Sequence, residues 1–148
     1  QCAVIDFARH RCNYTNANSS EFDQDANHPV IDIMSKQKKI KNKGATMRLG
    51  SYSCSVEKKS KAFSAYNEES INERHRHRYE VNDKYVKDLK NNGLLISGIN
   101  KKLNLVEIIE IEDHPWFVGV QFHPELKSRL LNSHPLFKDF INASIQNR

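Results

Sequence analysis

The spacing of hydrophobic residues predicts two helices, and capping residues predict a third. Apolar residues at positions 3, 4, 7 and 8 follow one helix face, so we expect a helix over residues 1–11. Apolar positions 136, 137, 140, 141 and 145 predict an amphipathic helix over 135–146, where proline is tolerated in the first turn. A third helix is expected over 82–89, because Asn and Asp are good N-caps and Gly93 suits a left-handed position after the helix.

Short apolar runs rich in β-branched and aromatic residues predict strands between these helices. Such runs cover residues 94–99, 103–111 and 116–122. Only short turns separate them, so we expect three consecutive neighbours in one sheet. Residues 44–56 alternate apolar and polar positions, with an interruption at Gly50, and predict another strand.

The remaining stretches are expected to be loops. Residues 13–20 are rich in Asn and Ser, which compete with the backbone for hydrogen bonds and end the first helix. Residues 21–33 are expected to be irregular, with a short apolar anchor. Residues 36–43 hold five lysines and no acid, and 58–61 form another basic patch. Like charges repel, so both are predicted to be solvated loops without a function of their own.

Composition predicts one soluble, cytoplasmic domain. The chain has 148 residues, of which 38% are hydrophobic and 28% charged. No apolar run reaches the roughly 20 residues that span a bilayer, and no signal-peptide pattern is present. Cys2, Cys12 and Cys54 form no C-x-x-C pair, which favours free thiols over a closed zinc site. The net charge of +5 allows an anionic partner but does not decide the function.

The segment 116–125 carries the strongest candidate chemistry. It is an apolar strand-like run that ends in His123, Pro124 and Glu125. In extended chain, residues two apart project to one side, so a Glu125 oxygen can reach a His123 ring nitrogen. A carboxylate that holds one ring nitrogen is the orienting half of a nucleophile, base and carboxylate triad. A motif this short also occurs by chance, and a histidine bonded to a neighbour for structural reasons is the simpler interpretation.

A second unusual stretch is the alternating block of arginine and histidine at 74–78. If 71–81 is a strand, the three arginines face one way and the two histidines the other. Three guanidiniums on one side predict an anion, which could be a carboxylate, a phosphate or neighbouring acids such as Glu73 and Glu80. The two histidines lack a third metal ligand, and bonds to backbone or acids explain them better. We assign no metal here.

Several stretches together resemble the glutaminase domain of CTP synthases, which are class I glutamine amidotransferases. The resemblance is carried by residues 17–23, 28–31, 46–50, 73–82, 106–108, 113–125 and 134–137. His-Pro-Glu is common to class I amidotransferases, including the GMP and carbamoyl-phosphate enzymes. The block at 74–78 and Thr-Met-Arg-Leu-Gly at 46–50 look specific to CTP synthases. The resemblance implies an α/β fold with a flavodoxin-like sheet flanked by helices, whose N-terminal strands lie outside this chain.

The resemblance also implies an activity. In this family a cysteine thiolate attacks the side-chain amide of glutamine, forms a thioester and releases ammonia, with which a synthetase domain converts UTP to CTP at the expense of ATP. His123 matches the general base and acid, and Glu125 matches its orienting carboxylate. Gln1, Glu21 and Arg78 match positions that hold the substrate glutamine, with Arg78 pairing with its α-carboxylate. One guanidinium and one acid suit an amino acid zwitterion.

The chain departs from the family pattern at the nucleophile. The family places it in a Gly-x-Cys-x-Gly elbow just before the position of Gln1, and no cysteine here lies in such an elbow. We therefore expect a chain cut from a longer protein and inactive by itself. Smaller departures are Ala45, where a glycine is usual, and Leu130, where a proline is usual.

The cofactors and partners implied by the resemblance belong mostly to the parent protein. No cofactor is expected in this segment, whereas ATP and Mg²⁺ are expected in an N-terminal synthetase domain, with GTP as an allosteric effector. L-glutamine, UTP and a homotetramer of the parent complete the expected partners, without nucleic acid or membrane.

Two other interpretations remain open. One is a catalytically dead glutaminase-like scaffold. The other is a nucleic-acid-binding domain that uses the block at 74–78 and the lysine-rich loops, although the alternation with histidines inside a predicted strand argues against it.

Overall fold

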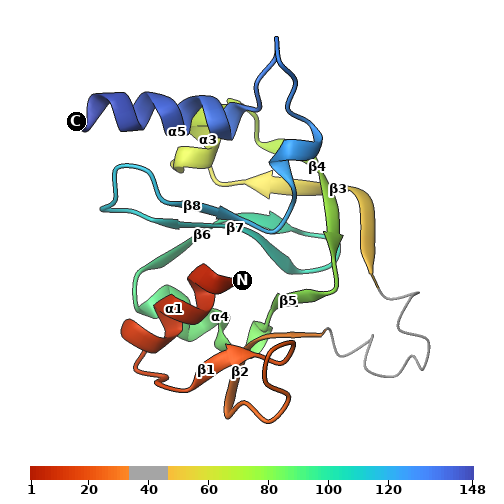
Figure 1. Cartoon of the computed structure of the whole chain (residues 1–148), viewed down its shortest axis with the longest axis vertical. Helices are drawn as coiled ribbons and strands as arrows, with labels where there is room; N and C mark the ends of the chain where they lie inside the picture. The colour runs from red at the N-terminus through yellow and green to blue at the C-terminus, as the bar shows by residue number, and fades with distance from the viewer. Residues whose placement is uncertain (34–46) are drawn as a thin grey trace. The chain divides into compact units, whose positions relative to one another are not determined.

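The computed structural model describes residues 1–33 and 47–148 (Figure 1). The chain forms two compact units. One comprises Gln1–Arg48 and His77–Leu94, and the other comprises Leu49–Arg76 and Leu95–Arg148. The lysine run at 36–43 lies outside the described residues. The expectation of a single domain stays a prediction.

The first unit is built on a three-stranded sheet with the order β1-β2-β5. Strand β1 (Ala17–Ser19) runs parallel to β2 (His28–Ile33), and β2 pairs antiparallel with β5 (Tyr79–Val81). Helix α1 (Cys2–His10) contacts β1 and β2. The buried side chains of this unit include Val4, Ile5, Phe7, Ala8, Ala17, Val30, Ile31 and Leu89.

Both predicted helices of the first unit are confirmed. Helix α1 lies within the predicted range, and α4 (Asp83–Asn91) follows Asn82, whose side chain accepts a hydrogen bond from the Lys84 N–H at 3.2 Å. Gly93 adopts φ +97° after this helix, the left-handed conformation in which glycine has no Cβ penalty.

The prediction of loops and irregular structure before residue 34 was wrong at Ala17–Ser19 and His28–Ile33, where β1 and β2 form. Strand β2 is only six residues long and lacks a long alternating pattern. Its hydrogen-bonding partner β5 comes from a distant part of the chain: Ile31 pairs with Val81. Tertiary pairing therefore creates this strand, and local spacing could not reveal it.

The second unit contains a five-stranded sheet with the order β4-β3-β6-β7-β8. Its strands are β3 (Arg48–Val56), β4 (Ser70–His77), β6 (Leu94–Asn100), β7 (Leu105–Ile111) and β8 (Val118–Val120). β3 pairs antiparallel with β6, and β7 pairs antiparallel with β8. The predicted neighbours β6, β7 and β8 are confirmed. The last strand is shorter than the predicted 116–122, because only its central residues join the ladder to β7.

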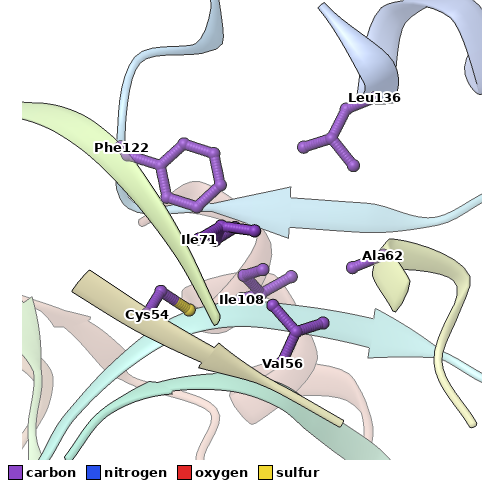
Figure 2. Close-up of a cluster of buried hydrophobic side chains, with 7 residues drawn as sticks. All are labelled: Cys54, Val56, Ala62, Ile71, Ile108, Phe122 and Leu136. Carbon is purple, nitrogen blue, oxygen red and sulfur yellow. The ribbon is translucent and has the colours of Figure 1, made fainter. Parts of the chain in front are cut away.

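Helices and a turn complete the second unit. Helix α5 (Pro135–Gln146) has the predicted bounds, and it packs against α3 (Lys61–Tyr66). Between β8 and α5 lies the 3₁₀ turn η2 (Pro124–Leu126). Figure 2 shows the core of this unit, which combines residues from the sheet, both helices and the segment before η2. These residues are Cys54, Val56, Ala62, Ile71, Ile108, Phe122 and Leu136.

Helix α3 replaces part of the loop predicted at 58–61. Its N-terminus is capped by Ser60, whose hydroxyl accepts the Phe63 N–H at 2.9 Å. The buried carboxylate of Glu110 accepts the N–H groups of Lys61 and Ala62 at 2.8 and 3.0 Å. Because Glu110 lies on β7, the cap depends on a partner that is distant in sequence. Within the described residues, no helix is long and apolar enough to cross a membrane.

Candidate active site

His123 and Glu125 form the predicted pair at the end of the second unit's sheet. Nδ1 of His123 lies 2.7 Å from Oε1 of Glu125. With the carboxylate at Nδ1, the neutral ring keeps its proton there and presents Nε2 as the basic nitrogen. The His123 side chain is 37% exposed and the Glu125 side chain 59% exposed, so both reach solvent.

The pair arises from a turn and not from the predicted extended strand. His123 occupies the position before η2, and the fixed φ of Pro124 suits the first residue of a helical turn. The Leu126 N–H donates to the His123 carbonyl at 3.1 Å and closes the turn. Phe122 and Pro124 are both buried. The two chain neighbours of His123 therefore anchor it while its own side chain remains accessible.

The environment keeps Glu125 ionised. Burial opposes ionisation, but hydrogen bonds from its own backbone N–H and from His123 outweigh burial and lower the pKa of Glu125. Electrostatic interactions with His123 and His134 act in the same direction. A carboxylate in this state can orient the imidazole and stabilise an imidazolium.

The residues predicted to hold an amino acid lie in the first unit. The Gln1 side-chain amide donates from Nε2 to Oε2 of Glu21 at 3.0 Å, so the structure brings these two together. Arg78 lies between β4 and β5. Its Nε is buried and has no hydrogen-bond partner among the described residues. A buried donor of this kind calls for an acceptor.

The block at 74–78 follows the predicted alternation only in part. Arg74 and Arg76 are exposed and His75 is buried, as expected for β4. The strand then breaks at Arg78, and β5 belongs to the other sheet, so the prediction of three arginines on one face fails at Arg78.

The two histidines of this block contact acids within their own units. His75 Nε2 lies 3.7 Å from Glu107, and His77 Nδ1 lies 3.4 Å from Glu80 and 3.1 Å from the Tyr79 carbonyl. Within residues 1–33 and 47–148, no cluster of three or more His, Cys, Asp or Glu could hold a metal ion.

The three cysteines differ in exposure. Cys54 is buried in the core of the second unit, and Cys2 is exposed as the first residue of α1. Burial and the charge of Asp88 raise the pKa of Cys12. The thiolate is the nucleophilic form of cysteine, and burial disfavours it.

A family model described as "Glutamine amidotransferase class-I" matches residues 1–143. This chain belongs to the class I glutamine amidotransferases. Among the relatives of this amidotransferase chain are two CTP synthases. That of Caldanaerobacter subterraneus is 56% identical over 145 residues, which cover 98% of the chain and 27% of the relative. That of Clostridium kluyveri is 55% identical over 148 residues, which cover 100% of the chain and 28% of the relative.

A solved structure gives the same result for the fold. The glutaminase domain of Trypanosoma brucei CTPS, with bound acivicin, matches with a TM-score of 0.90 and 36% identity, covering 99% of this chain and 57% of that one. The resemblance to the CTP synthase glutaminase domain and the mixed α/β fold class are thus confirmed. The amidotransferase chain spans just over a quarter of the length of the two CTP synthases.

The sequence patterns missed a contact beside the candidate site of this amidotransferase chain. Lys127 directly follows η2 and donates from Nζ to Oε1 of Glu73 at 3.2 Å. Glu73 is fully buried on β4. One signal was available: Glu73 occupies an inward position of the alternating strand, and an inward acid requires partners.

Proposed function

We propose that this chain is the glutamine-hydrolysing part of a CTP synthase, an enzyme that uses the released ammonia for ATP-dependent amination of UTP to CTP. The observation that carries the proposal is the 2.7 Å contact between His123 and Glu125, in a chain that belongs to the class I amidotransferases and is 55–56% identical to CTP synthases.

In the proposed reaction His123 moves protons and Glu125 holds the imidazole. Nε2 of His123 takes the proton of a cysteine thiol, and the resulting thiolate attacks the side-chain amide carbon of glutamine. The C–N bond breaks, and His123 gives the proton on Nε2 to the leaving nitrogen, which departs as ammonia. His123 then takes a proton from water, which attacks the thioester; the C–S bond breaks, and the return of that proton to sulfur yields glutamate and the free thiol. Throughout, Glu125 keeps the proton of Nδ1 in place and stabilises the imidazolium.

The nucleophile is proposed to lie outside these 148 residues. The raised pKa of Cys12 and the burial of Cys54 support this proposal, as does the absence of an elbow glycine on either side of Cys2. The 148 residues alone are therefore expected not to hydrolyse glutamine.

Gln1, Glu21 and Arg78 are the proposed glutamine-holding residues. Arg78 would pair with the α-carboxylate, which its buried Nε without a partner supports. Glu21 carries the charge that suits the α-ammonium group, and the Gln1 amide bound to it at 3.0 Å fixes its carboxylate. ATP, Mg²⁺, UTP and the effector GTP are proposed to bind elsewhere in the parent protein, which is proposed to be a cytoplasmic homotetramer.

The test is His123→Ala in the full-length protein that contains this chain. Loss of the general acid and base should lower kcat for ammonia release from glutamine by about 10² to 10⁴-fold. CTP formation from UTP and ATP with added ammonium chloride should be unchanged, because ammonium bypasses glutamine hydrolysis. Formation of glutamate and of CTP measures the two activities.

The outcome also decides between the proposal and its alternatives. Wild-type protein that makes CTP from ammonium but releases no ammonia from glutamine would favour the catalytically dead scaffold. Equal ammonia release by wild-type protein and His123→Ala would contradict the role given to the histidine.

A further inference from the structure

The turn at residues 123–127 is hydrogen-bonded to strand β4 at both of its ends. At its first residue, the His123 N–H donates to the Arg74 carbonyl at 2.9 Å. At its last residue, Lys127 Nζ donates to the Asn72 carbonyl at 2.7 Å and to Oε1 of Glu73 at 3.2 Å. The three acceptors are consecutive residues of one strand. A rigid strand thus fixes the turn on both sides of Glu125.

Glu73 connects this attachment to the two helices of the second unit. Its Oε1 accepts the Tyr66 hydroxyl of α3 at 2.9 Å and lies 3.1 Å from Nε2 of His134, the N-cap of α5. Nδ1 of His134 accepts the Leu136 N–H at 3.3 Å. The proton of the neutral imidazole is therefore on Nε2, where it is donated to Glu73.

The contact between Lys127 and Glu73 joins opposite charges. Burial opposes ionisation of Glu73, but hydrogen bonds from His134 and Tyr66 and electrostatic interactions with His134 and Lys127 lower its pKa. Burial and the charge of Glu73 raise the pKa of Tyr66, which stays neutral and donates. The Glu73 side chain is 0% exposed and that of Lys127 is 43% exposed. Among the donors to Glu73, Lys127 is the one that belongs to the turn.

We propose that Lys127 is a positioning residue: its contacts with Glu73 and the Asn72 carbonyl fix the turn that orients His123 and Glu125. This inference rests on the proposed glutamine hydrolysis. Lys127 acts through the backbone of the turn. A displacement of a reacting group by about 1 Å can lower a rate on the order of 10²-fold, so a loosened turn should affect the chemical step.

The test is Lys127→Met in the full-length protein, because methionine keeps an unbranched chain and removes the ammonium group. In Lys127→Met, kcat for ammonia release should fall tenfold or more, whereas the KM for glutamine should stay within twofold of wild type. Ammonium-dependent CTP formation should be unchanged. Lys127→Arg, which retains a cationic donor, should recover most of the loss. By hydrogen–deuterium exchange mass spectrometry, a peptide covering residues 121–128 should exchange faster in Lys127→Met than in wild-type protein.

Lys61→Met is the matched control. Lys61 Nζ also donates to two backbone carbonyls, those of Ile111 at 3.1 Å and Glu112 at 2.8 Å, and neither carbonyl belongs to the turn. This variant should keep wild-type kcat and wild-type exchange at 121–128.

Two results would overturn the inference. One is exchange at 121–128 that is the same in Lys127→Met and wild-type protein. The other is a loss of kcat no larger than that of Lys61→Met. If wild-type protein releases no ammonia, the proposed function fails, and the exchange comparison still decides whether Lys127 holds the turn.

Discussion

At the residue scale, Arg78 differs from the other arginines of its block. Arg74 and Arg76 are exposed on β4, whereas the chain bends at Arg78 and buries its Nε without a partner among the described residues. Leaving a buried donor unpaired costs about 1–3 kcal/mol. A ligand with a carboxylate would remove this cost, which favours Arg78 over its neighbours as an anion-binding residue.

Arg78→Lys should therefore raise the KM for glutamine about tenfold or more and change kcat less. Lysine keeps the charge but loses the planar pair of donors that matches a carboxylate. Arg76→Lys, on the exposed face of β4, is the control and should leave both constants within twofold of wild type. Steady-state kinetics of glutamate formation measure the effect. An unchanged KM for glutamine in Arg78→Lys would contradict the glutamine-binding role assigned to Arg78.

Glu73 should make the stability of the protein sensitive to acid. Its pKa is lowered in the folded state, so its contribution is complete above its ordinary pKa of about 4.3 and is lost as the pH falls through the lowered value. Glu73→Gln removes the carboxyl group that titrates at this position. The thermal midpoint of wild-type protein should exceed that of Glu73→Gln most at neutral pH, and the difference should shrink on acidification below about pH 4.3. A difference that grows on acidification would contradict this assignment.

At the element scale, glycine in β6 allows the sheet and the core to pack closely. A Cβ at Gly98 would lie 2.7 Å from Ile108 Cβ and 2.8 Å from Cys54 Sγ, which is closer than side-chain atoms approach one another. Both neighbours belong to the buried core shown in Figure 2. A larger residue there would require Ile108 or Cys54 to shift.

Gly98→Ala should lower the free energy of unfolding by about 1–3 kcal/mol, because it overpacks a core without space. Gly93→Asn is the comparison. Space around Gly93 is open, and asparagine tolerates its positive φ better than other residues, so a smaller loss is expected. Denaturant unfolding followed by circular dichroism measures both variants. Equal losses in the free energy of unfolding of the two variants would show that the side chains next to Gly98 move aside without destabilising the protein.

The elements with strong local signals were predicted well. Helix α5 has the predicted bounds, since its apolar positions repeat at helical spacing over 12 residues. Helix α4 was predicted from its caps, and strands β6, β7 and β8 from dense apolar runs. The elements that were missed, β1, β2 and α3, are 3, 6 and 6 residues long. At that length tertiary partners outweigh local preference.

At the scale of the whole molecule, the candidate residues are divided between the two compact units. Gln1, Glu21 and Arg78 belong to the first unit, and His123 and Glu125 belong to the second. The structure shows two contacts among these residues, Gln1 with Glu21 and His123 with Glu125. Spacing along the chain predicted the second contact, whereas the family pattern marked Gln1 and Glu21 only as positions that hold glutamine.

By itself the sequence determined the family, the long helices, the neighbouring strands β6 to β8 and the contact of His123 with Glu125. Each of these depends on residues close together in the chain or on a motif that can be recognised in the sequence itself. The tertiary structure decided the pairing of β2 with β5, the capping of α3 by Glu110 and the fastening of the His123 turn to β4 through Lys127 and Glu73. These contacts join residues that are distant in sequence. Burial and hydrogen-bond geometry, which no local pattern encodes, select such partners.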